Sequence, residues 1–257
     1  MSQRSAVILH VPHDSTDIPL EYRDDIVLDD PALDREILAM TDMHTDALYN
    51  LPGAVKIVFP VSRLLLDPER FPDDAQEPMA ERGMGMIYEV TSQLEKLRDL
   101  PSPALRRELK EKYYDPHHLR LEQSTSKALE ATGKALIIDC HSFPSKALPY
   151  EKRKPDDPRP EICIGTDEFH TPDPLYRVMR DAFEAKGYSV DKDVPFSGAL
   201  TPLKYYQQDK RVCAIMIEVR RDLYMDQLTG ERSPGFDKVK SDLTEVMEKV
   251  ADQFTDF

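Results

Sequence analysis

The chain has 257 residues, 40% of them hydrophobic, and a formal net charge of −14. This length and apolar content predict a single domain over 1–257 with a sizeable core, and no apolar run approaches the ~20 residues that cross a bilayer. Acidic residues outnumber basic ones by 48 to 34, which disfavours nonspecific nucleic-acid binding, and three cysteines, an odd number, argue against a disulfide framework.

The first predicted element is a strand over 6–11, and the residues before it lack the apolar segment of a secretory signal, so we expect a cytoplasmic protein. Further strands are predicted at 55–59, 135–140, 161–165 and 212–219. Helical spacing predicts helices at 31–50, 173–186 and 236–254, and a helical region over 86–132. This alternation of strands and helices indicates an α/β fold.

Two of these helical regions carry more specific expectations. In 31–50, Asp30 is expected to cap a continuous helix that begins with Pro31. In 86–132, prolines 101 and 103 interrupt the helix, and Asp115 followed by Pro116 is expected to restart it, so that Leu119, Leu121 and Ala128 pack against the sheet. The polar stretch 143–160 is expected to be a lid or a rim beside the functional site.

Titratable residues stand at the carboxyl ends of three predicted strands. His13 follows the first strand, His141 follows the strand at 135–140, and Glu218 interrupts the apolar run 212–219. Ligands bind at this edge of an open α/β sheet, and two histidines with carboxylates suit a hydrolytic metal site. The alternatives are hydrogen-bonded structural histidines and a structural ion pair for Glu218.

A site with two histidines needs an oxygen ligand as well. Asp42 and Asp46 are four residues apart, so they are expected on one stripe of the helix 31–50, although either one also fits a solvated acidic face. His10 lies inside the first strand and is expected to pack or to support the ligands. Arg63 and Arg70 are expected to anchor an anionic substrate through bidentate contacts, unless Asp67 pairs with one of them.

Other classes of protein are compatible with parts of this pattern. The same ligands are compatible with a structural ion in a non-catalytic metal-binding or small-molecule-binding protein. The acidic surface is compatible with a protein that binds a basic partner. A metal-free hydrolase that uses Cys140 and a histidine is a further alternative, although Cys140 and His141 are neighbours in a strand and are expected to point to opposite faces.

Taken together, these segments resemble the N-formylglutamate amidohydrolase family. The resemblance lies in the order and spacing of short motifs that include His10-Val11-Pro12-His13, Ser62-Arg63-Leu64-Leu65-Leu66-Asp67 and Asp139-Cys140-His141-Ser142. Further matching segments lie at 41–49, 113–121, 162–166, 195–198 and 217–225. The chain departs from the family at Asp14-Ser15-Thr16, where a glycine is frequent, and at Glu69, where an asparagine is common.

The resemblance implies a three-layer α/β/α sandwich with a mostly parallel or mixed sheet, a phosphorylase/hydrolase-like architecture related to the zinc carboxypeptidases. It implies a metal-dependent amidohydrolase that cleaves the amide bond of an N-acyl amino acid such as N-formylglutamate. The implied cofactor is a divalent metal, with zinc favoured. The implied metal ligands are His13, Asp42 and His141, with Asp46 less favoured. Glu218 is the implied base, with Arg63 or His118 stabilising the oxyanion. The implied substrate-binding residues are Arg63, Arg70, Arg220 and Ser142.

Overall fold

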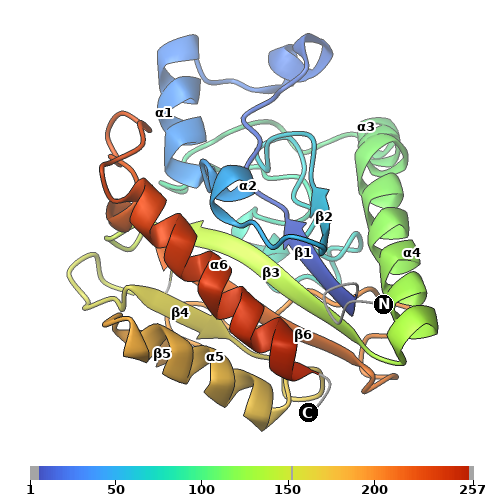
Figure 1. Ribbon diagram of the computed structural model, residues 1–257. Coiled ribbons are helices and arrows are strands. Elements are labelled where there is room, and N and C mark those ends of the chain that lie inside the picture. The colour runs from blue at the N-terminus through green and yellow to red at the C-terminus, as the bar shows by residue number, and fades with distance from the viewer. Residues whose placement is uncertain (1–5, 152, 255–257) are drawn as a thin grey trace.

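The computed structural model describes residues 6–151 and 153–254, and its centre is one six-stranded sheet in the order β2-β1-β3-β6-β4-β5 (Figure 1). Strands β2, β1, β3 and β6 run parallel, β4 pairs antiparallel with β6, and β5 runs parallel to β4. The strands are β1 (Val7–Val11), β2 (Val55–Val58), β3 (Ala135–Phe143), β4 (Ile162–Gly165), β5 (Val190–Lys192) and β6 (Val212–Arg220). The sheet is therefore mixed, as expected, and the fold is α/β.

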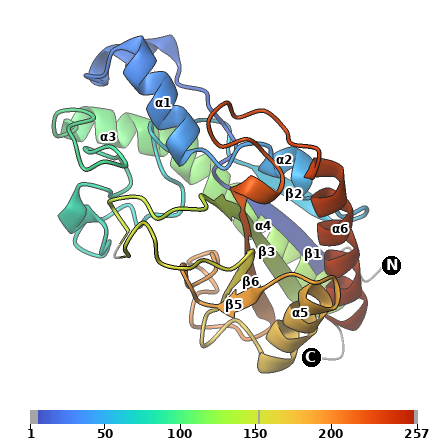
Figure 2. The same ribbon diagram turned by 90° about the vertical axis from the view of Figure 1, so that its left-hand side faces the viewer.

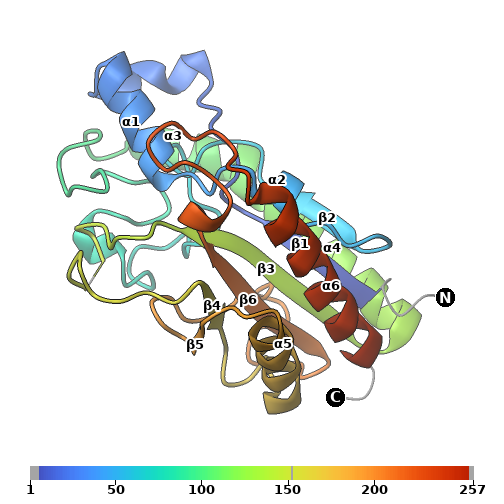
Figure 3. The same cartoon turned by 60° about the vertical axis from the view of Figure 1, so that its left-hand side comes forward.

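Helices cover both faces of this sheet (Figures 2 and 3). Alternate residues of the buried strands point to opposite faces. Leu9, Ile138 and Ile215 belong to a core with α5 (Asp173–Ala185) and α6 (Phe236–Gln253), whereas Ile8 and Ile137 belong to a core with α4 (Asp115–Thr132). Because β1, β3 and β6 are apolar on both faces, they require cover on both, which produces the three layers.

The five predicted strands are all present. β3 is longer than predicted and continues to Phe143, so His141 lies inside the strand. The sixth strand, β5, was missed because it has only three residues, two of them charged and exposed, which gives no apolar pattern. Helices α5 and α6 closely match the predictions at 173–186 and 236–254.

The expectation of one helix over 31–50 is wrong. Helix α1 (Asp30–Met40) is followed by the extended residue Thr41, and α2 (Thr45–Leu48) begins after His44, which adopts the left-handed conformation with φ of 70°. The cap is Asp29 rather than Asp30, since the Asp29 side chain accepts a hydrogen bond from the backbone of Ala32 at 2.9 Å. The break removes Asp42 from any helix, and Asp42 and Asp46 therefore do not share a stripe.

The second helical region also differs from its prediction. Residues 86–100 are irregular, with only isolated bridges, and helix begins at α3 (Pro103–Leu109). A π-helical turn at Lys110–Tyr114 joins α3 to α4, so the chain stays helical through Asp115 and Pro116 instead of restarting there. Leu121 and Ala128 pack against the sheet as predicted, but Leu119 is 53% exposed.

Three short 3-10 turns complete the described elements, at Leu20–Asp25, Ala80–Arg82 and Arg221–Leu223. Within residues 6–151 and 153–254, no helix combines the length and the hydropathy that crossing a membrane requires. The described residues of the stretch 143–160 form no helix or strand beyond the end of β3, and Pro144, Leu148 and Tyr150 line the cavity at the carboxyl edge of the sheet.

Candidate metal centre

A cavity of about 140 Å³ lies at the carboxyl ends of β1, β3 and β6. Each strand or the turn after it contributes a titratable side chain, as the strand-end pattern predicted. His13 follows β1, His141 is near the end of β3 and Glu218 is near the end of β6. The polar residues that line the cavity are His13, Asp42, Arg63, Glu69, Arg70, His141, Ser142, Ser197, Glu218 and Arg221.

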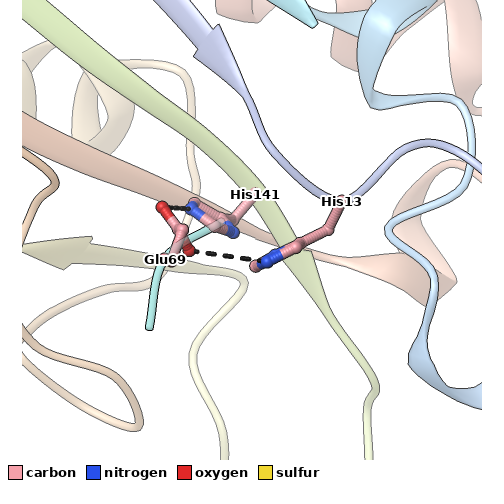
Figure 4. Close-up of side chains that lie close together, drawn as sticks. All are labelled: His13, Glu69 and His141. Atoms are coloured by element: carbon pink, nitrogen blue, oxygen red, sulfur yellow. Dashed lines mark hydrogen bonds and ion pairs between the residues drawn. The ribbon is translucent and has the colours of Figure 1, made fainter. Parts of the chain in front are cut away.

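Three of these side chains form a compact set of potential metal ligands. His13, Glu69 and His141 each offer one nitrogen or oxygen atom, and these atoms lie within 4.8 Å of one another. The carboxylate of Glu69 lies between the two imidazoles: its Oε1 is 3.2 Å from His141 Nε2 and its Oε2 is 3.7 Å from His13 Nε2 (Figure 4). Two histidines and one carboxylate are a donor set that catalytic zinc sites use.

A loop rather than a helix or strand positions Glu69. The backbone N–H of Glu69 donates to Asp67 Oδ1 at 2.9 Å, and the backbone N–H of Asp67 donates to the carbonyl of Met86 at 2.8 Å. Asp67 itself is fully buried, with His13 Nε2 2.9 Å away and Arg63 Nη2 donating at 3.0 Å. This buried carboxylate therefore fixes both the loop and the first histidine.

Asp42 contacts the opposite edges of the two rings. Its Oδ2 lies 3.2 Å from His141 Nδ1 and 3.7 Å from His13 Nδ1, and its Oδ1 accepts a hydrogen bond from Arg221 Nη2 at 2.8 Å. The predicted ligand is thus on the Nδ1 side of both imidazoles, whereas the carboxylate that faces both Nε2 atoms is Glu69. Asp46 lies outside the cavity and pairs with Lys56 at 3.0 Å.

Electrostatics support these placements. Burial alone would raise the pKa of Asp42 and of Asp67, but hydrogen bonds from the histidines and the charge of Arg221 hold the pKa of Asp42 well below its ordinary value. The charges of His13 and Arg63 do the same for the pKa of Asp67. Both groups stay ionised, as partners of histidines and arginines must.

A second buried chain of contacts supports His141 from the α4 side of the sheet. Asp139 Oδ1 lies 3.2 Å from His141 Nε2 and 2.8 Å from His10 Nδ1. His10 Nε2 is 2.9 Å from His117 Nε2 on α4. His10 therefore supports its neighbours, as predicted, although its Nδ1 also lies 3.7 Å from Glu69 Oε1.

Glu218 differs from the other carboxylates of the cavity. Within the part of the chain that the structure describes, its buried Oε2 has no hydrogen-bond partner. Burial raises the pKa of Glu218 to about 8. A carboxyl group whose pKa lies near neutrality can both accept and donate a proton under physiological conditions, which is the property required of a general acid–base group.

The predicted arginines divide into two groups. Arg63 and Arg70 line the cavity, and both lie close to Asp67. Arg220 does not line it, because its guanidinium pairs with Asp222 at 2.7 Å. The next residue, Arg221, does reach the cavity. It is buried and donates hydrogen bonds to Asp42 and to the carbonyl of Ala39.

Of two other predicted residues, Ser142 lines this cavity and His118 does not. Ser142 lines the cavity, where its hydroxyl accepts a hydrogen bond from Arg221 Nε at 3.3 Å. His118 lines a neighbouring cavity instead, and its Nε2 lies 2.8 Å from the carbonyl of Pro68. Burial lowers the pKa of His118 to about 4, so this side chain is neutral at pH 7.

Cys140 and His141 point to opposite faces, as the strand pattern predicted. Cys140 belongs to the core beneath α5 and α6, and its thiol donates to the carbonyl of Ile138 at 3.3 Å. Burial raises the pKa of this thiol well above its ordinary value. The thiolate that a nucleophile needs is therefore disfavoured, and no cysteine–histidine pair forms here.

The sequence analysis assigned none of Glu69, Asp67 and Arg221 to the centre, although its alternative that Asp67 pairs with Arg63 or Arg70 is confirmed. The available signal was local: Asp67, Glu69 and Arg70 crowd four positions directly after the apolar run Leu64–Leu66. Charged side chains beside a buried run need partners, because burial of an unpaired charge is costly. Here Asp67 contacts His13 and Glu69 contacts His141.

Comparisons with known proteins bear on the family and the fold of the chain. The family model of N-formylglutamate amidohydrolase matches residues 5–225. The crystal structure of N-formylglutamate amidohydrolase from Ralstonia eutropha JMP134 has a TM-score of 0.83 at 23% identity, over 96% of this chain and 93% of that one. A gene product of Agrobacterium tumefaciens has a TM-score of 0.71 at 23% identity, over 97% and 92%. Both likenesses show a shared fold. No curated protein matches the sequence.

Proposed function

This chain belongs to the N-formylglutamate amidohydrolase family. From that premise we propose that it hydrolyses the amide bond of an N-acyl amino acid such as N-formylglutamate. The reaction uses a divalent metal, for which zinc is the first choice. The observation that carries the proposal is the set of His13, Glu69 and His141 at the carboxyl edge of the sheet, with Glu218 in the same cavity. This donor set belongs to the type found in hydrolytic zinc sites that keep a position open for water.

The charges around the cavity favour a cation. Asp42 is paired with Arg221 and Asp67 with Arg63, but among the described residues the ion pairs of the Glu69 carboxylate are all with imidazoles. Glu69 and Asp139 raise the pKa of His141 well above its ordinary value despite its burial, so the site attracts positive charge. A divalent ion would supply that charge and displace the proton.

The donor atoms are also prepared for an ion. Asp42 on the Nδ1 side of His141 orients its ring so that Nε2 faces Glu69, which is the usual role of a carboxylate behind a metal-bound histidine. We therefore propose His13, Glu69 and His141 as the ligands. A divalent ion bound there would polarise the amide carbonyl and lower the pKa of a water molecule.

The remaining steps fall to the side chains of this chain. Glu218 accepts the proton of the attacking water and later delivers it to the leaving amine, for which its buried, raised-pKa carboxyl is suited. Arg63 and Arg70 hold the carboxylates of the amino acid by bidentate hydrogen bonds. Arg63 lines the same cavity, and its charge stabilises negative charge on the carbonyl oxygen.

We also propose that the partner of this chain is a small N-acyl amino acid and that it works in the cytoplasm without nucleic-acid or membrane partners. The net charge of −14 supports the exclusion of nucleic acid, because phosphates require basic patches.

The proposal is tested with protein purified without chelator. We expect elemental analysis to find a divalent metal bound to the chain, and we expect release of formate from N-formylglutamate that stops after chelation and returns on addition of zinc. The matched control is the His13→Ala variant, which should neither retain the metal nor recover activity. Bound metal without turnover of any N-acyl amino acid would indicate a non-catalytic metal-binding protein instead.

A further inference from the structure

A second, larger cavity adjoins the metal centre. It has a volume of about 320 Å³ and shares Glu69, Arg70, Ser197 and Met216 with the first cavity. His13, Glu218 and Arg63 do not line it. A substrate bound at the centre can therefore extend from Glu69 in two directions, towards Arg63 in one cavity and into the second cavity in the other, with Arg70 lining both.

The second cavity has Glu69, Arg70, Asp139 and Asp167 among its lining residues, and the rest of its wall is mostly apolar and aromatic. This apolar and aromatic wall comes from the π-helical turn and the start of α4, from the segment before β6 and from β6 itself, and includes Tyr114, His118, Leu200, Leu203, Tyr206 and Met216. Because the pKa of His118 is lowered by burial, this imidazole adds no positive charge to the wall. Cavities of this size and lining hold the apolar part of a small ligand.

The apolar surface continues to the outside. A third hollow of about 540 Å³ shares Tyr114, His118 and Leu203 with the second cavity and adds Leu119. Leu119 and Leu203 are each 53% exposed, and they are two of only eight large apolar side chains that are exposed among the described residues. These two side chains leave apolar surface at one opening, beside the charged residues Lys110, Glu111, Asp115 and Glu122, and an apolar ligand can bury it.

A formyl group does not account for this space, since it has a single carbon atom and needs no pocket beyond the metal centre. We propose that the second cavity binds the acyl part of the substrate, and that this acyl part is an apolar chain or ring of several carbon atoms. The inference rests on the proposed function. Water adds its oxygen to the acyl carbon, the C–N bond breaks and the proton passes to the amine, so the products are a carboxylic acid and an amino acid.

The test compares N-formyl-, N-acetyl-, N-hexanoyl- and N-phenylacetyl-L-glutamate as substrates of the intact protein. We expect kcat/KM for the hexanoyl and phenylacetyl compounds to exceed that for the formyl compound by at least about tenfold, because each methylene in an apolar pocket changes kcat/KM by about 10-fold or more. Calorimetry should detect binding of hexanoate, and acetate should bind at least tenfold more weakly.

Leu203→Glu supplies a variant that spares the fold, because Leu203 is half exposed. A carboxylate at this wall should lower the ratio of hexanoyl to formyl kcat/KM by at least tenfold. Leu228→Glu is the matched control, since Leu228 is 88% exposed and lines none of the three cavities, and it should leave the ratio unchanged. A second variant, Ala199→Phe, narrows the cavity and should lower the same ratio.

The outcomes separate the two proposals. Hydrolysis of N-formylglutamate with activity that falls steadily as the acyl group grows, and a ratio that Leu203→Glu does not change, would overturn this inference and leave the amidohydrolase function intact. Failure to hydrolyse any of the four compounds, with metal bound, would overturn the amidohydrolase function and this inference with it.

Discussion

Burial, rather than a hydrogen bond or an ion pair, is the largest cause of the raised pKa of Glu218. Its Oε2 is buried without a hydrogen bond to any described residue, and burial raises its pKa to about 8. We expect Glu218→Gln to lower kcat by about 10²–10⁴-fold, because the amide keeps the shape but cannot carry the proton. The assay is formate or carboxylate release, with metal content measured in parallel. Full activity in this variant would remove Glu218 from the mechanism.

Asp42 contacts the proposed metal ligands and Asp46 does not, so we expect substitutions at the two positions to differ in their effect on zinc affinity. Asp42 is buried against the Nδ1 edge of His141, whereas Asp46 is half exposed and pairs with Lys56. We expect Asp42→Asn to weaken zinc affinity by about 10–100-fold, as loss of a carboxylate behind a metal ligand does. Competition with a chelator of known affinity measures it. Asp46→Asn is the matched control, and equal affinities in the two variants would contradict the assignment.

At this scale the sequence predicts His13 and His141 but not their third partner. Both histidines follow apolar runs whose strand character is unambiguous, so their common edge can be predicted. Glu69 lies in an irregular segment held by the side chain of Asp67, and no period in the sequence reports such a loop. The same reason explains the choice of Arg220 over Arg221, since the turn after β6 decides which of two adjacent arginines points inward.

Two leucines of helix α4 differ in burial, so their substitution tests which face of the helix packs against the sheet. Leu121 is fully buried against the sheet, and Leu119, two residues earlier, is 53% exposed. We expect Leu121→Ala to lower the free energy of unfolding by about 2–5 kcal/mol through the cavity it leaves. Leu119→Ala should change the same quantity by less than about 0.5 kcal/mol. Urea denaturation measures both, and similar losses in the two variants would show that α4 is rotated relative to this description.

Elements with strong apolar patterns were predicted and weakly patterned ones were not. β1, β3 and β6 are buried on both faces and read as continuous apolar runs. The break between α1 and α2 escaped prediction because no proline or glycine marks it: Thr41 ends α1 and His44 takes a left-handed conformation. Tertiary contacts impose this break, since the backbone N–H of Asp42 donates to the carbonyl of His13 at 2.9 Å.

For the whole molecule, the architecture concentrates carboxylates at one edge of the sheet. Asp42, Asp139 and Glu218 come from three separate segments, Asp67 and Glu69 share a fourth, and all five carboxylates meet around the two histidines. Folding brings these negative charges together, which costs free energy unless cations accompany them. A protein with this site should therefore be more stable with a divalent ion bound.

Thermal unfolding tests this coupling. Zinc at about 100 times its dissociation constant should stabilise the folded chain by about 2.7 kcal/mol, and for a chain of this size the Tm should rise by roughly 5–10 °C relative to the chelated protein. The His13→Ala variant should show no such rise. A Tm that is the same with zinc and with chelator would mean that the folded state holds no ion.

Crystallography at the zinc absorption edge can show whether His13, Glu69 and His141 together hold one divalent ion. The structure of the zinc-loaded protein should show one anomalous peak within coordination distance of Nε2 of His13 and His141 and of a carboxylate oxygen of Glu69. No peak in this cavity, or a peak bound by Asp42 in place of Glu69, would contradict the account.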